Sequence, residues 1–207
     1  MYLFSRTRRI NTARGRAAMA KTVEIAARVS EISGYTISAW TTVFSPDFGT
    51  VRWTCRVEHL EELESINDKL AVSEDFGNMV EEADHLYSGP LQDSLVQLIH
   101  GAPTGDPPRY IQATTAQAAN GSLVASLGLA VELAEAGSRI TGQPTLVGTG
   151  VTGPYGQVVW ISGAPDLATA EQANAALAAD SSWAQLVDRA SNVFQPGAAT
   201  TMFRRIT

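Results

Sequence analysis

An internal repeat is the feature of this sequence that most limits what the chain can fold into. The segment 23–26, Val-Glu-Ile-Ala, occurs again as Val-Glu-Leu-Ala at 131–134, an offset of 108 residues. At the same offset Ser30 matches Ser138 and Gly34 matches Gly142. Self-similarity at a fixed offset indicates a duplicated structural unit. The chain is therefore predicted to contain the same unit twice.

The similarity continues after a one-residue deletion, beyond which the offset is 107. Two unrelated helical stretches rich in Ala and Val would not repeat Trp and Gly at strand and turn positions. The segment 101–108 between the copies is rich in Gly and Pro, which favour turns and extended linkers. We predict a first copy over 1–100, a linker over 101–108 and a second copy over 109–207. The matches at the second offset include Gly49 with Gly156, Trp53 with Trp160, Phe76 with Trp183, and Tyr87 with Phe194.

Hydrophobic periodicity divides each copy into the same series of elements. In the first copy, residues 2–10 are rich in β-formers, and we expect a helix from its N-cap at about Asn11 to Ser33, with Gly34 as its left-handed stop. Further strands are predicted at 35–44, 51–57 and 95–100, and further helices from about 60 and 73. In the second copy the strands are predicted at 110–117, 145–150, 157–162 and 200–206, and the helices at 120–141 and from about 167 and 180.

The order β-α-β-β-α-β is that of the ferredoxin-like, or split-βαβ, motif. Such a unit is a four-stranded sheet with helices on one face, and its other face must be buried against something. A second copy in the same chain is the obvious partner. The predicted fold class is therefore α+β, with two tandem ferredoxin-like repeats that form an intrachain version of a dimeric α/β barrel.

Composition excludes several classes of protein. The formal net charge of −6 argues against a nucleic-acid partner, which calls for a concentrated basic surface. The single cysteine, Cys55, forbids an internal disulfide, and no Cys/His cluster has the spacing of a metal site. No apolar run is long enough to span a bilayer. The arginines of segment 6–16 lack the apolar stretch of a secretory signal, so we expect a cytoplasmic protein with no membrane partner.

Three segments of the second copy give a family resemblance. Gln-Val-Val-Trp at 157–160, Asp-Leu at 166–167 and Ala-Ala-Leu-Ala-Ala-Asp-Ser-Ser-Trp at 175–183 resemble the NIPSNAP family and the wider dimeric α/β-barrel superfamily. The first copy carries a more diverged version at 50–53, 59–60 and 70–76. The resemblance implies a barrel of two facing sheets. Its relatives include heme-degrading and quinone-forming monooxygenases, lactone isomerases and proteins of unknown role, so the fold alone does not define an activity.

One strand face of the first copy offers a candidate ligand site. Arg52 and Arg56 alternate along one strand and share a face, where the second copy has apolar residues. If that face points into a barrel, two guanidinium groups would suit a flat ligand with a carboxylate or enolate oxygen. Trp40 and His100 are expected at the same wall. The alternative is that the arginines meet helix acids such as Glu24 or Glu31, or face solvent.

Histidines give a weaker signal. Heme-degrading relatives carry a heme-ligating histidine on the second-half helix of a unit, and His85 lies on such a helix. It is predicted to point about 200° away from the apolar stripe, as a surface side chain. His59 is read as a polar helix-start residue.

The sequence therefore favours a small-molecule-binding α/β barrel, with a cofactor-independent monooxygenase or isomerase acting on an aromatic or polyketide-like compound as the leading hypothesis. No resident cofactor or metal is expected. The alternatives are a non-catalytic structural or assembly protein of the NIPSNAP type and a heme-binding protein. Two copies in one chain can bury each other's uncovered sheet face, so a partner chain is not required. A homodimer remains an alternative, because outer strands of two chains could pair.

Overall fold

A computed structural model describes residues 1–103 and 105–207, so Thr104 of the expected linker lies outside the described residues. Each copy contains the predicted series of elements. The first copy comprises β1 (Tyr2–Ile10), α1 (Gly15–Ser33), β2 (Ile37–Val43), β3 (Thr50–Val57), α2 (Leu60–Ala71), α3 (Glu74–Ala83) and β4 (Tyr87–His100). The second comprises β5 (Tyr110–Gln117), α4 (Leu123–Thr141), β6 (Thr145–Gly150), β7 (Gln157–Ala164), α5 (Leu167–Ala179), α6 (Ser181–Ala190) and β8 (Ala199–Arg205).

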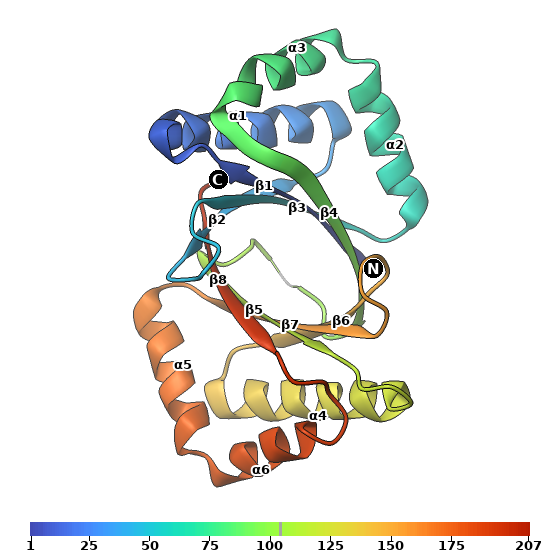
Figure 1. Ribbon diagram of the computed structural model, residues 1–207, viewed down its shortest axis with the longest axis vertical. Coiled ribbons are helices and arrows are strands. Elements are labelled where there is room, and N and C mark those ends of the chain that lie inside the picture. The colour runs from blue at the N-terminus through green and yellow to red at the C-terminus, as the bar shows by residue number, and fades with distance from the viewer. Residues whose placement is uncertain (104) are drawn as a thin grey trace. The chain divides into compact units, whose positions relative to one another are not determined.

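The strands confirm the predicted fold class. Their hydrogen-bonded order is β1-β3-β2-β8-β5-β7-β6-β4, and it closes into an eight-stranded barrel. The chain divides into two compact units, one of Met1–Leu95 with Arg204–Thr207 and one of Val96–Phe203. The end of β4 therefore belongs to the second unit and the end of the chain to the first. Within each unit the helices lie on one face of the strands (Figure 1).

Equivalent hydrogen bonds hold equivalent elements in the two units. The indole Nε1 of Trp53 donates to the carbonyl oxygen of Thr22 on α1 at 3.0 Å, and that of Trp160 donates to Ala130 on α4 at 2.9 Å. Each indole also meets a second ring edge-on, Tyr87 at 6.0 Å and Phe194 at 5.4 Å. The duplicated tryptophans thus hold the long helix against the sheet and contact the segment that follows the last helix in both units.

The turn after each long helix is also duplicated. Gly34 and Gly142 adopt positive φ angles of 83° and 69° and close their helices in the left-handed conformation. In each unit a serine hydroxyl one turn before the glycine accepts from the first residue of the next strand. These bonds join Ser30 to Ile37 at 3.0 Å and Ser138 to Thr145 at 2.9 Å.

Several element boundaries differ from those predicted, and β4 differs most. Asn11 caps a short 3-10 turn, Thr12–Arg14, before α1 begins at Gly15. The last strand of the first copy, predicted over 95–100, begins at Tyr87. The dipeptide Gly89-Pro90 lies within β4 at exposed positions, where a strand tolerates a proline. The side chains of Arg6 and Asp93 form a bidentate ion pair at 2.8 and 2.7 Å that joins β1 to this added part of the strand.

Candidate functional site

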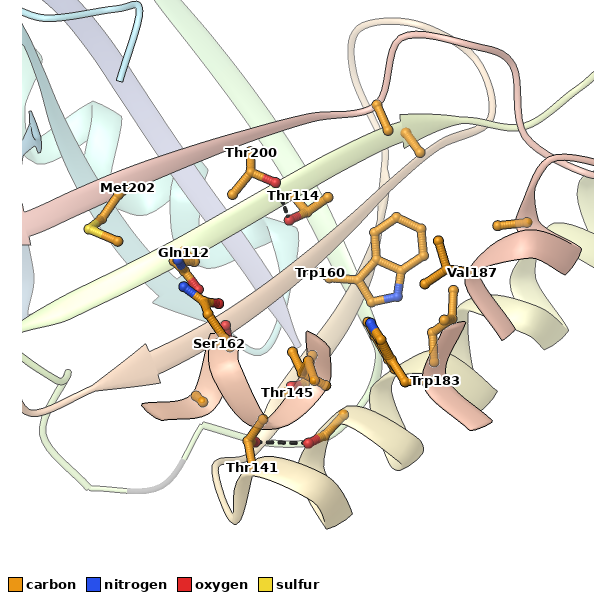
Figure 2. A pocket seen from close by; sticks show the side chains of 18 of the residues that line it. Gln112, Thr114, Thr141, Thr145, Trp160, Ser162, Trp183, Val187, Thr200 and Met202 are labelled. Atoms are coloured by element: carbon orange, nitrogen blue, oxygen red, sulfur yellow. Dashed lines mark hydrogen bonds between the residues drawn. The ribbon is translucent and has the colours of Figure 1, made fainter. Parts of the chain in front are cut away.

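A cavity of about 630 Å³ lies within the second unit, between the sheet and its covering helices. Its floor is the helix-facing side of β5, β7 and β8, and its other walls come from α4, α5, α6 and the segment that follows α6. Figure 2 shows the side chains that converge on it. A cavity of this size accommodates a small organic molecule.

Aromatic side chains form one end of the cavity. Trp160 from β7 and Trp183 from α6 both line it, close to Val187 (Figure 2). The carboxylate of Asp180 caps α6 and accepts from the backbone N–H of Trp183 at 2.9 Å, which fixes the start of the helix that carries this indole. On α4, Gly137 faces the same ring, and a Cβ there would meet its edge at an ordinary contact distance of 3.6 Å.

Hydroxyl and amide groups line the floor beside these rings. The hydroxyls of Thr114 on β5 and Thr200 on β8 are 2.8 Å apart and hydrogen-bonded (Figure 2). Gln112 and Ser162 are register partners on β5 and β7, two pairs along from Thr114 and Trp160, and therefore share the same face. The cavity therefore combines flat apolar walls with a set of neutral hydrogen-bonding groups.

The walls carry no formal charge. None of the described residues that line the cavity is Asp, Glu, His, Lys or Arg. A charged ligand group that entered would lose water without gaining an ionic partner, which is costly. The arrangement is suited to uncharged parts of a molecule, held by ring contacts and by hydrogen bonds from hydroxyls and amides.

The first unit has larger or more apolar side chains at the matching positions. Where the second unit has Ala173, Ala170 and Gly137, the first has Ile66, Leu63 and Val29. The same is true of the sheet, where the second unit has Gln112, Ser162 and Thr145 in place of Phe4, Cys55 and Ile37. All six residues of the first unit belong to its buried core cluster or pack against it.

Three of the predicted site residues lie on the other face of the first unit's strands. Arg52 and Trp40 are register partners on β3 and β2, and Arg56 follows on the same side of β3. Arg52 Nε donates to the hydroxyl of Thr7 at 3.3 Å. Trp40 is buried, and its indole Nε1 donates to the hydroxyl of Thr54 at 2.9 Å. Desolvation lowers the pKa of Arg52 to about 10, partly opposed by the charge of Asp47.

The expected helix acids have other partners. Glu24 pairs with Lys21 at 2.7 Å, and Glu31 pairs with Arg28 at 2.7 Å.

Desolvation raises the pKa of the buried Cys55 thiol to about 11, so this thiol is protonated at neutral pH.

The histidines are placed separately. His100 is half-buried at the end of β4, opposite Val147 of β6 in the second unit. His85 is exposed, as predicted, and its Nδ1 lies 2.8 Å from the carbonyl oxygen of Glu82. His59 forms a capping box with Glu62 at the start of α2, which agrees with its reading as a helix-start residue. Within residues 1–103 and 105–207, no cluster of three or more His, Cys, Asp or Glu side chains is arranged to hold a metal ion.

Sequence reasoning missed the cavity because its walls are mostly residues of ordinary cores. A signal was nevertheless present in the repeat. Placing the two copies side by side shows small or polar residues in the second at positions where the first has large apolar ones, as in Ile66 against Ala173. A search limited to titratable residues passes over such a difference.

Solved structures with the same fold extend over the whole chain. A candidate monooxygenase from Fusobacterium nucleatum superposes with a TM-score of 0.73 at 6% identity, covering 100% of this chain and 92% of its own. An anthrone oxidase-like protein gives 0.67 at 13% identity, with 100% and 91% covered. A candidate monooxygenase from Lactobacillus acidophilus gives 0.67 at 9%, with 100% and 94% covered.

These similarities establish a shared α/β-barrel fold. They establish the fold alone, because sequence identities this low carry no information about activity. No protein-family model matches the sequence, and no curated protein matches it. In the described part of the chain, no helix is both long and apolar enough to cross a membrane.

Proposed function

We propose that this protein binds a small organic molecule in the cavity of its second unit and acts there as a cofactor-independent monooxygenase or isomerase on an aromatic or polyketide-like compound. The observation that carries the proposal is the cavity itself, about 630 Å³ where the matching positions of the other copy hold core side chains. Empty space in a core is destabilising, so a retained cavity favours a role in binding.

The chemistry of the walls supports an aromatic ligand. Trp160 and Trp183 offer flat surfaces against which a ring system can pack. The hydroxyls of Thr114 and Thr200 can exchange hydrogen bonds with a ring oxygen. The similar structures named as candidate monooxygenases and as anthrone oxidase-like lend support at the level of fold alone.

Oxygenation of an anthrone illustrates a reaction of the proposed kind. The substrate carbon carries two hydrogens and is oxidised by O₂ to a carbonyl, with one oxygen atom retained and the other released as water. The substrate supplies all the electrons, so no separate reductant is needed. The cavity would orient the ring and exclude bulk water from the activated carbon.

Isothermal titration with 2-naphthol at pH 7 tests the binding part of the proposal. Ala173→Ile places the first copy's residue in the cavity and should weaken binding at least tenfold. Ala175→Ile makes the same change at an exposed position of α5 and should leave binding unchanged. Equal affinity in both variants, or no binding to the parent protein, would contradict the cavity as the site.

Oxygen uptake with anthrone tests the catalytic part. The parent protein should form anthraquinone faster than buffer does, and Ala173→Ile should abolish the difference. Binding of 2-naphthol without turnover of either anthrone or a lactone substrate would leave a binding protein and remove the enzyme assignment. It would then favour the non-catalytic alternative.

A second candidate site stays a prediction. Arg52, Arg56, Trp40 and His100 were expected to contact a ligand with a carboxylate or enolate oxygen, and the half-buried guanidinium of Arg52 beside Trp40 supports the arginine–tryptophan part of that set. Arg52→Leu should weaken binding of an aromatic carboxylate while leaving 2-naphthol binding unchanged.

A heme site is tested by adding heme, and a Soret shift that His85→Ala abolishes would support it.

A further inference from the structure

Two ion pairs of the first unit lie where the second unit has its cavity. Arg6 on β1 pairs with Asp93 on β4 through two hydrogen bonds of 2.8 and 2.7 Å. Arg8, two residues along the same face, pairs with Asp84 just after α3 and lies over the ring of Tyr87 at 4.9 Å. Both arginines share the helix-facing side of the sheet with Trp53, the register partner of Arg6.

The second unit replaces both partners of each pair by neutral residues. Thr114 and Thr200 stand at the positions of Arg6 and Asp93, and their hydroxyls keep a hydrogen bond of 2.8 Å. Ala116 and Ser191 stand at the positions of Arg8 and Asp84. All four replacements line the cavity. Since no member of either pair is left behind, the wall has lost its charges without leaving an unpaired ion.

From this joint replacement we infer that the cavity selects uncharged ligands and rejects anions. The inference rests on the proposed function, since it names the class of molecule that the same cavity takes. The rings of the ligand pack between Trp160 and Trp183, and its hydroxyl or carbonyl oxygens meet the hydroxyls of Thr114 and Thr200. A carboxylate carried with the rings between the sheet and the helices would lose part of its hydration and find only neutral donors, which do not repay the cost.

A matched pair of ligands tests the inference on the unaltered protein. At pH 7, 2-naphthol is neutral and 2-naphthoate is an anion, while their ring systems are the same. Isothermal titration should show 2-naphthol binding at least tenfold more tightly. Because Arg52 belongs to a separate candidate site for carboxylates, the comparison counts only the binding that Ala173→Ile weakens. Equal affinities by that measure, or tighter binding of 2-naphthoate, would overturn the inference and leave the proposed cavity site standing. Binding of neither ligand would instead contradict the proposed function itself, and the inference with it.

Restoring the first copy's arginine should reverse the selection. Thr114→Arg brings a guanidinium to the cavity wall, at a position where the first copy carries Arg6. We expect 2-naphthoate to gain at least tenfold in affinity. Thr114→Val is the matched control, because it removes the hydroxyl and adds no charge, and 2-naphthoate should stay weak. A gain in both variants would overturn the inference, and so would a folded Thr114→Arg protein without any gain. The ratio measured on the parent protein decides the question if the arginine variant fails to fold.

Discussion

The two units keep the same framework of turns and hydrogen bonds, but they use the space between sheet and helices differently. Trp53 and Trp160 each bond the long helix of their own unit, and Gly34 and Gly142 end those helices in the same conformation. The side chains that fill the space between sheet and helices then differ between the units. The first unit has a core cluster with Ile66 among its buried members, whereas the second has a cavity beside Ala173.

This difference teaches that the framework and the filling can change independently. A few contacts that both units share, such as the indole-to-carbonyl bonds, hold the long helix against the sheet. The side chains in the middle of the layer can then become smaller or more polar without losing the fold. The cost is apolar burial that the second unit forgoes, at about 25 cal/mol per Å².

The largest expected effect comes from hollowing the first unit. Ile66 is 6% exposed within the first unit's core cluster. Ile66→Ala should lower the free energy of unfolding by about 2–5 kcal/mol, through lost burial and the space left behind. The reverse change, Ala173→Ile, enters existing space and should alter stability by less than about 1.5 kcal/mol. Urea unfolding of both variants measures this contrast, and equal destabilisation would show that the two layers are not filled differently.

The fold was predictable because the framework residues are conspicuous. Tryptophans and glycines that recur at a fixed offset, as in Trp53 with Trp160, indicate the duplication, and hydrophobic periodicity predicts the βαββαβ order of each copy. The strand β4 was predicted too short: its first part contains Gly89-Pro90, a dipeptide typical of turns, and is joined to β1 by the tertiary ion pair of Arg6 with Asp93. The barrel was predicted from the need to bury the second face of each sheet, whereas its strand order comes from the structure.

The cavity was not predictable from residue chemistry, because it is made by what is missing. Alanine at 170 and 173 and glycine at 137 carry no reactive group and read as ordinary helix residues. The size of the space depends on how the helices are held by Trp160 and by the cap at Asp180, which are tertiary contacts. The search for charged groups led instead to Arg52 and Arg56, whose role stays a prediction.

An intermediate effect is expected from Cys55, which occupies the position of the cavity residue Ser162. Burial raises its pKa from 9.0 to about 11 in the folded chain. The neutral thiol is thus favoured by folding, and its contribution to stability is complete below pH 9 and is lost as the pH rises to about 11. The slope for one such group approaches about 1.4 kcal/mol per pH unit.

The difference in unfolding free energy between the parent protein and Cys55→Ser, followed from pH 7 to 11, isolates this thiol from other titrating groups. The stability advantage of the parent should shrink above pH 9. Parallel curves over the whole range would show that the layer around Cys55 admits water, as the matching layer of the second unit is proposed to admit a ligand.

The smallest effect concerns a polar contact that the two copies do not share. In the first unit the hydroxyls of Thr22 and Tyr87 are buried and 3.0 Å apart, and the second unit has Ala130 and Phe194 at these positions. Thr22→Ala should cost about 1–2 kcal/mol, because it leaves the buried phenol with a single longer bond of 3.4 Å to the carbonyl of Ala18. Thr22→Ala combined with Tyr87→Phe reproduces the pair of the second unit and should cost less than the sum of the single changes, because no polar group is then left behind. A double-mutant cycle of urea unfolding measures the coupling between the two hydroxyls. Strict additivity would mean that they do not stabilise the protein together. The two differences between the copies at these positions would then be independent of each other.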